Sequence, residues 1–295
     1  MAVYHHGSRA VQDRVGVREL ADHVGRAMGT GIKPVAAAFL ELQPLLILGA
    51  ADPDTGRVWA TPLSGTPGFV RATGPHRMSV AGGPPPADPL ATALTTPGTP
   101  VGTIALDPRT RRRMRLNGRL HPTERGFAVE ADQVFANCPK YLQKRQTYET
   151  VPDRVPGPPR RTTELSPAQA RFIETADTFF LATVHPHGAD TSHRGGNPGF
   201  VQVTSPRELT WRDYPGNSMF LTLGNLLTDP RAGLLLMDWT TGTTLQLTGE
   251  ARTEYGTDGE RRVRFTLTEA VETEFALPLR WSPPEYSPAN PDPAG

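Results

Sequence analysis

The feature that most constrains the fold of this chain is an internal repeat. Matching segments recur 131 positions apart (199 minus 68 for the glycine of the motif PGFV). Three pairs keep this shift: PGFV at 67–70 and 198–201, Gly102 and Gly233, and Asn117-Gly118 and Thr248-Gly249. One register kept over three separated segments predicts that the chain is a tandem duplication whose halves share one fold.

Composition suggests where the halves meet. Residues 151–161 (VPDRVPGPPRR) are Pro-rich and are interpreted as an extended linker. This leaves 1–150 as the N-terminal domain and 162–295 as the C-terminal domain. Each half shows a helical pattern and then about six short strands, which is typical of a small antiparallel barrel. Two barrels of one ancestry would pack as homodimer subunits do, around a pseudo-twofold axis.

Local patterns predict individual elements. Apolar runs indicate buried strands at Leu45–Ala51, Val101–Leu106 and Thr178–Val184. Helical patterns cover residues 11–29, 132–146 and 217–228. A further helix begins at Ser166, which forms a capping box with Gln169 and precedes a proline at the first helical position.

Composition also excludes several classes of function. The formal net charge is +1, so bulk charge gives no argument for a nucleic-acid partner. Cys138 is the single cysteine, which excludes an internal disulfide and a cysteine-based zinc cluster. The N-terminus has no apolar signal core, and the longest apolar run, Leu45–Ala51, is far shorter than a membrane span. We therefore expect a soluble, cytoplasmic protein without a membrane or nucleic-acid partner.

The stretch from Ser192 to Asp229 carries the first candidate site. Arg194 stands beside Gly195 and Gly196, where the lack of side chains lets backbone approach a ligand closely. Asn217 is placed to cap the helix that follows, with free N–H groups at the helix start. An arginine near a helix N-terminus indicates a phosphate site, while the same residues also fit an ordinary capped helix after a hairpin.

A second candidate site lies on the predicted strand from Arg111 to Leu120. Six arginines fall between positions 109 and 119. Alternation along a strand places Arg111, Arg113 and Arg115 on one face. This face is either a solvated side of a hairpin or an anion site.

Histidines offer a third possibility, a metal site, which the spacing does not favour. The residues concerned are His5, His6, His185, His187 and His193. The first pair is typical of a solvated terminal arm. No carboxylate or cysteine stands at a metal-ligand spacing with the other three, so we predict no metal.

The C-terminal half carries short motifs in a characteristic order. They are SHRGG at 192–196, PGFV at 198–201, DYPGN at 213–217, LGN at 223–225, DPR at 229–231 and GLL at 233–235. With these motifs it resembles the pyridoxamine 5'-phosphate oxidase-like, FMN-binding split-barrel family, and the N-terminal half resembles the same superfamily more weakly. The resemblance implies a mainly β protein with flanking helices, in which two tandem split β-barrels form an intrachain pseudo-dimer and hold FMN in the groove between them.

The resemblance also implies which residues bind the cofactor: Ser192, Arg194, Gly195, Asn217, Ser218, Thr222 and, from the other barrel, Arg113. Arg194 would contact the FMN phosphate, and Arg113 would reach the same phosphate from the partner barrel. The phosphate-binding lysine of the family has no counterpart in this region. Because only the C-terminal half keeps Arg194 and Asn217, we predict one cofactor site per chain.

The function that follows is an FMN-dependent oxidoreductase that acts on a small molecule by hydride or electron transfer. Lys140 and Tyr141, in an element found in such proteins (Asn137 to Tyr141), and His193 are the candidate catalytic residues. The superfamily also contains users of the deazaflavin F420 and haem-binding members. These cofactors, and a non-enzymatic cofactor-binding module, stay open as alternatives. The protein would be a monomeric pseudo-dimer or a homodimer.

Overall fold

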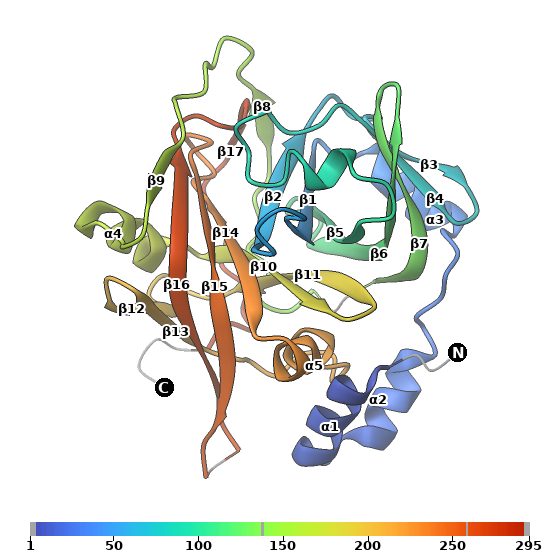
Figure 1. The fold of residues 1–295 in the computed structure, drawn as a ribbon, viewed down its shortest axis with the longest axis vertical. Coiled ribbons are helices and arrows are strands. Elements are labelled where there is room, and N and C mark those ends of the chain that lie inside the picture. Colours follow the sequence, from blue (N-terminus) through green and yellow to red (C-terminus); the bar gives the residue numbers. More distant parts are fainter. Residues whose placement is uncertain (1–3, 137–138, 258, 292–295) are drawn as a thin grey trace.

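The fold was taken from a computed structural model, which describes residues 4–136, 139–257 and 259–291. It is mainly β, with two large antiparallel sheets and flanking helices, as predicted (Figure 1). None of the helices in the described ranges has the length and apolar character that a membrane span needs.

The first sheet lies in the N-terminal half and has the strand order β2-β1-β5-β6-β7-β4-β3. Its strands are β1 (Leu45–Ala51), β2 (Val58–Ser64), β3 (Val70–Gly74), β4 (Arg77–Ala81), β5 (Pro100–Asp107), β6 (Arg112–Thr123) and β7 (Gly126–Ala136).

The second sheet lies in the C-terminal half and has the order β11-β10-β14-β15-β16-β13-β12, with β9 added beside β16. Its strands are β9 (Arg160–Thr162), β10 (Thr178–His185), β11 (Gly188–Gly195), β12 (Val201–Ser205), β13 (Glu208–Arg212), β14 (Arg231–Met237), β15 (Thr244–Tyr255) and β16 (Arg261–Thr273). A small separate sheet pairs β8 (Tyr148–Thr150) with β17 (Leu279–Trp281).

The two large sheets repeat one topology. Each strand of the first order corresponds to the strand numbered nine higher in the second. The register shift between Asn117 and Gly118 recurs between Thr248 and Gly249. Both strand orders are open at their ends, so among the described residues neither sheet closes, in agreement with the split form of the predicted barrels. The tandem duplication itself and the domain boundaries stay predictions.

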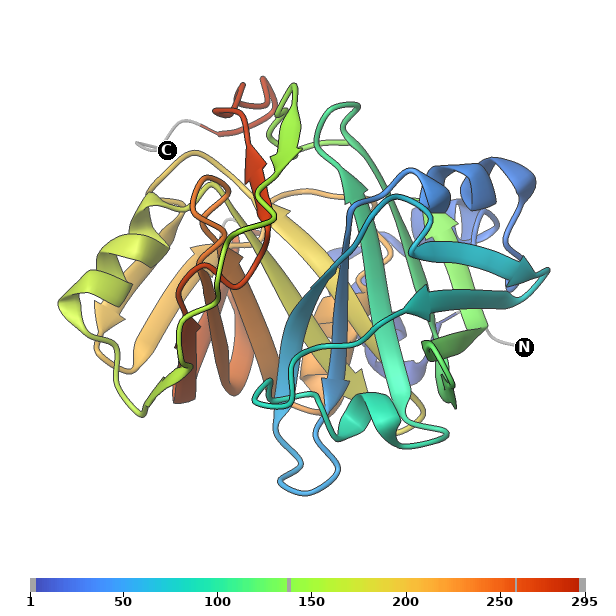
Figure 2. The ribbon, with the colours of Figure 1, turned by 90° about the horizontal axis from the view of Figure 1, so that it is seen from above.

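The two sheets lie side by side (Figure 2). They come into close backbone contact at two glycines. A Cβ atom at Gly102 of β5 would lie 2.5 Å from the carbonyl carbon of Asp190 in β11. A Cβ atom at Gly233 of β14 would lie 2.6 Å from Cα of Trp59 in β2. These glycines are 131 positions apart (233 minus 102), so the two contacts are reciprocal, as expected for a pseudo-twofold arrangement.

Short helices flank the sheets. They are α1 (His6–Val15), α2 (Arg18–Gly25), α3 (Pro34–Glu41), α4 (Pro167–Thr175) and α5 (Leu221–Thr228), with a 3₁₀ turn at Ala93–Thr95. The predicted capping box is confirmed at the start of α4, where Ser166 and Gln169 bond each other. In Figure 1, α1 and α2 lie beside α5, far from the first sheet's centre.

Two helix predictions were wrong. The single helix over 11–29 is interrupted at Gly16, whose left-handed backbone (φ 72°) ends α1 before α2 starts. Residues 132–136 continue strand β7 because they pair with β6, for example Val134 with Leu116. Residues 139–146 hold no helix either; Asn137 and Cys138 lie outside the described residues.

Candidate functional site

A cleft opens where the two sheets meet and contains about 870 Å³ of space, counting the part open to solvent. It brings together most of the residues singled out in the sequence: Arg113, Lys140, Tyr141, His193, Arg194, Gly195, Asn217, Ser218 and Thr222. Ser192 is the exception. It is fully buried, and its hydroxyl donates to the carbonyl oxygen of Leu181 (3.3 Å).

His193 lies at the centre of the positive charge in the cleft. Arg113 Nη1, from β6, lies 2.6 Å from His193 Nδ1. Because a guanidinium only donates hydrogen bonds, Nδ1 must accept, and the ring proton then sits on Nε2. Burial, with Arg113 and Arg194 as the next causes, lowers the pKa of His193 well below its ordinary value. The imidazole is therefore neutral, and its buried Nε2 has no partner among the described residues.

Arg194 is held by a shared carboxylate. Its Nη1 donates to Asp213 Oδ1, and Arg261 Nε donates to Asp213 Oδ2 at 3.0 Å. Asp213 is only 8% exposed and thus divides one negative charge between two guanidinium groups. The buried Nε of Arg194 has no partner among the described residues.

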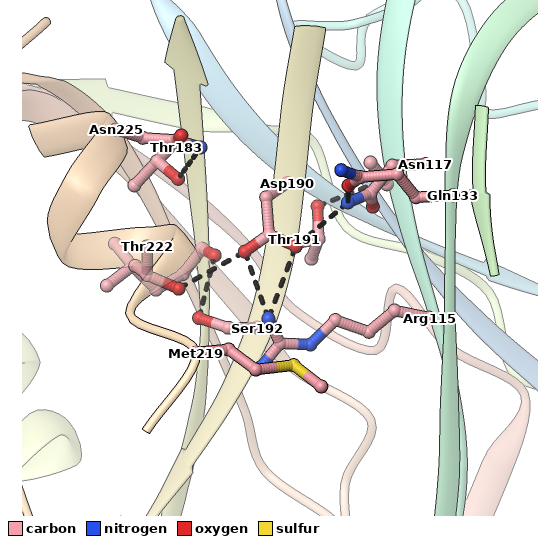
Figure 3. A network of polar contacts seen from close by, with 12 residues as sticks. Arg115, Asn117, Gln133, Thr183, Asp190, Thr191, Ser192, Met219, Thr222 and Asn225 are labelled. Carbon is pink, nitrogen blue, oxygen red and sulfur yellow. Dashed lines mark hydrogen bonds and ion pairs between the residues drawn. The ribbon is translucent and has the colours of Figure 1, made fainter. Parts of the chain in front are cut away.

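A second buried carboxylate, Asp190 of β11, ties the two sheets to α5 (Figure 3). Arg115 Nη1 donates to both of its oxygens at 3.0 and 3.2 Å, and Asn117 Nδ2 donates at 3.1 Å. From the other side, Thr222 Oγ1 donates to Asp190 Oδ2 at 3.1 Å. Arg115 is therefore paired with Asp190, while Arg113 of the same strand contacts His193.

The loop before α5 differs from the predicted capped helix. The helix begins at Leu221 and not at Asn217, and no side chain caps it. Asn217 Oδ1 instead accepts from the backbone N–H of Met219 (3.2 Å), a local turn typical of asparagine. Ser218 and Phe220 adopt left-handed backbone conformations (φ 60° and 54°), which stop the helix from extending further back.

Lys140 and Tyr141 reach the cleft from the connection between the sheets. The Tyr141 hydroxyl donates to the carbonyl oxygen of Pro215 (3.0 Å), and its ring lies 5.1 Å from that of Tyr214. Gly195 makes this approach possible, because a Cβ there would lie 2.0 Å from the carbonyl oxygen of Tyr141.

The position related to the cleft by the 131-residue shift is filled by side chains. Gln246 corresponds to Arg115 (246 minus 115), and its Nε2 donates to Thr61 Oγ1 at 3.0 Å and Asp88 Oδ2 at 3.2 Å. Leu90 and Leu94, on the same segment as Asp88, are buried in the core of the first sheet. Hydrogen bonds to protein atoms thus hold Gln246 at the position that corresponds to Arg115.

The histidines outside the cleft make other contacts. His5 stacks on His185 with ring centroids 4.7 Å apart, and its Nε2 lies 2.8 Å from Asn225 Oδ1. Among the described residues there is no group of three or more His, Cys, Asp or Glu that could hold a metal ion.

Sequence analysis missed the two carboxylates of the site. Asp190 stands in an otherwise uncharged run, ADTSH, and a lone acid in a buried strand signals a paired cation. Asp213 belongs to the motif DYPGN but had no role. Both contacts join strands far apart in sequence, which local patterns do not reveal.

Comparisons with known proteins come from sequence and from structure. Residues 165–292 match the family model described as pyridoxamine 5'-phosphate oxidase. No curated protein matches the chain. Among similar solved structures are HupZ from group A Streptococcus (8% identity, TM-score 0.29, covering 35% of this chain and 89% of that one), a conserved protein of unknown function from Corynebacterium diphtheriae (11%, 0.29, 39% and 98%) and a FAD-binding protein from Mycobacterium smegmatis (13%, 0.27, 40% and 98%). These likenesses are too distant to indicate a function.

Proposed function

We propose that this chain, of which residues 165–292 match the pyridoxamine 5'-phosphate oxidase family model, is a flavin-dependent oxidoreductase that holds FMN in the cleft between its two sheets. One chain supplies both sides of that cleft, so no second copy is needed to complete it. The observation that carries the proposal is the charge of the cleft.

Four guanidinium groups gather there around two carboxylates. Arg115 and Asp190 form one buried pair. Arg194 and Arg261 share Asp213, and Arg113 lies against the neutral His193. Counted over the described residues named here, the cluster holds four guanidinium groups and two carboxylates in a half-buried place. A phosphate dianion would offset this excess, and a guanidinium binds two phosphate oxygens in a fork.

Buried donors at the same place support an acceptor-rich ligand. Arg194 Nε and His193 Nε2 are buried without hydrogen-bond partners among the described residues. Buried donors in native proteins nearly always have an acceptor, so an unpaired pair of them in a cleft favours a ligand that supplies oxygens. The FMN phosphate fits this requirement, with Arg113 and Arg194 on opposite sheets as its ligands.

Bound FMN would supply hydride or electron transfer to a small substrate. The chain would bind and orient the cofactor and the substrate and shield them from water. Tyr214, Trp211 and Phe220 line the cleft and provide apolar surface for a ring system. His193 does not act as a general base in this arrangement, because Arg113 occupies its Nδ1 and its Nε2 carries the proton. It can instead donate a hydrogen bond. Lys140 and Tyr141 remain the candidates for handling a proton of the substrate.

A visible spectrum of the purified protein, followed by titration with FMN, tests the proposal. We expect flavin absorbance, or uptake of added FMN, with saturation at one FMN per chain. A spectrum with haem or F420 absorbance would show that the protein binds that cofactor and not FMN. A colourless protein that takes up none of the three would overturn the proposal and leave a non-enzymatic module.

A further inference from the structure

The backbone of Met219, in the loop that lines the cleft, is held by two side chains, one from the same loop and one from a distant part of the chain. Its N–H donates to Asn217 Oδ1 within the loop. Its carbonyl oxygen accepts from Gln12 Nε2 of α1 at 2.9 Å. Gln12 is fully buried, although glutamine is ordinarily a surface residue. The N-terminal helix therefore bonds directly to the cleft loop.

This loop needs support from outside. Met219 lies between Ser218 and Phe220, which both have left-handed backbones without being glycine. Such conformations cost free energy and persist where the surrounding structure holds them. The bond from Gln12 acts at the residue between the two, so it is placed to keep both in that conformation.

The contact between α1 and α5 is close enough to transmit this support. A Cβ at Gly7 would lie 2.3 Å from the carbonyl oxygen of Gly224, and a Cβ at Gly224 would lie 2.5 Å from Cα of Ser8. The two helices thus touch backbone to backbone. Tyr4 and Ala21 of the N-terminal segment also pack in one apolar cluster with Met219 and Leu221.

The N-terminal segment is anchored at its other end as well. Gly29 donates to the carbonyl oxygen of Val134 in β7 and accepts from its N–H (3.1 and 2.6 Å). The segment thus links the first sheet, at β7, to helix α5 of the second half.

From these contacts we infer that Gln12 is a positioning residue of the cleft: it fixes the Asn217–Phe220 loop in its ligand-ready conformation from outside the site. That the ligand is FMN rests on the proposed function. The positioning of the loop does not.

Amide hydrogen exchange of a peptide covering residues 216–223, in the protein without added ligand, tests the loop directly. Gln12→Met removes the donor at similar volume, and Gln12→Glu also removes it but can keep the contact with Arg9. Each leaves the Met219 carbonyl unsatisfied, so exchange in this peptide should rise roughly five- to a hundredfold. Tyr4→Phe is the matched control, because it removes another buried bond of the same segment, from Tyr4 Oη to the carbonyl oxygen of Ala21.

Exchange at the wild-type rate in both Gln12 variants would overturn the inference, and so would equal acceleration in Tyr4→Phe. FMN titration then separates the two proposals. If wild type binds FMN, Gln12→Met should bind it more weakly by a similar factor, and unchanged affinity would show that the loop does not serve the cofactor. If wild type binds no FMN, the proposed function fails, while hydrogen exchange still decides whether Gln12 positions the loop.

Discussion

Arg113 donates to Nδ1 of His193 across the junction of the two sheets, at 2.6 Å. The contact joins β6 of the first sheet to β11 of the second, so it sets both the tautomer of the imidazole and the place of the arginine. The neutral ring itself contributes no charge to offset that of the guanidinium.

The double substitution of Arg113 and Arg194 tests the shared phosphate. A hydrogen bond to a charged group contributes about 1.5–3 kcal/mol, so Arg113→Ala or Arg194→Ala should weaken FMN binding roughly ten- to a hundredfold. The effects of the two should be non-additive, because both side chains would meet one dianion. Fluorescence quenching of FMN measures this, and riboflavin, which lacks the phosphate, is the control. Equal losses for riboflavin would show that the arginines act through structure.

Asp190→Asn should destabilise the fold by about 3–5 kcal/mol, since it leaves the Arg115 charge buried without a counter-charge. Urea unfolding measures the change, and Asp153→Asn, at an exposed position, should be near neutral. Adding Arg115→Met to Asp190→Asn should recover part of the loss because no unpaired charge then remains. A double variant less stable than Asp190→Asn alone contradicts this account.

Gly102→Ala and Gly233→Ala should each destabilise the protein by about 1–3 kcal/mol, because the new methyl group meets backbone of the opposite sheet. Gly83→Ala is the matched control, as nothing lies within 4 Å of its added Cβ. Equilibrium unfolding decides the point. A loss at only one of the two glycines would argue against a reciprocal junction.

Stability should fall as the pH drops below about 6.5. Burial lowers the pKa of His185 from 6.5 to about 4, with the charges of His5 and His187 as the next causes. At pH values between about 4 and 6.5, His185 is protonated in the unfolded state but neutral in the folded state. Lowering the pH therefore favours unfolding. His193 and His5, whose pKa values are also lowered, add to the same trend. Urea midpoints at pH 7 and pH 5 should differ less in His185→Gln than in wild type; an unchanged difference would falsify this assignment.

Elements buried on both faces were predictable because their sequence is apolar throughout. β1 has the predicted bounds, Leu45–Ala51, and β10 extends the predicted Thr178–Val184 by one residue. The end of β7 was not predictable, because Gln133 and Val134 are held by pairing with β6 and not by their own pattern. Long-range pairing overrode the local helical signal there.

The residues of the candidate site also fall into those that the sequence could predict and those that it could not. Arg194 and Gly195 could be placed from their motif, since the motif itself lines the cleft. The carboxylates that hold the arginines, and the bond from Gln12 to Met219, join segments that only the fold brings together. A sequence shows which residues can bind an anion but not how their charges are already paired.

The network of Gln246, Thr61 and Asp88 has a consequence for how such a protein can change. In a homodimer every residue occurs twice. A substitution that fills one ligand site therefore also fills the symmetry-related site, and both are lost together. Here the two sheets are encoded at separate positions in one chain, and a substitution in one leaves the other untouched. The position around Gln246 can thus serve stability alone while the cleft keeps its charged lining. Two identical subunits could not separate these roles.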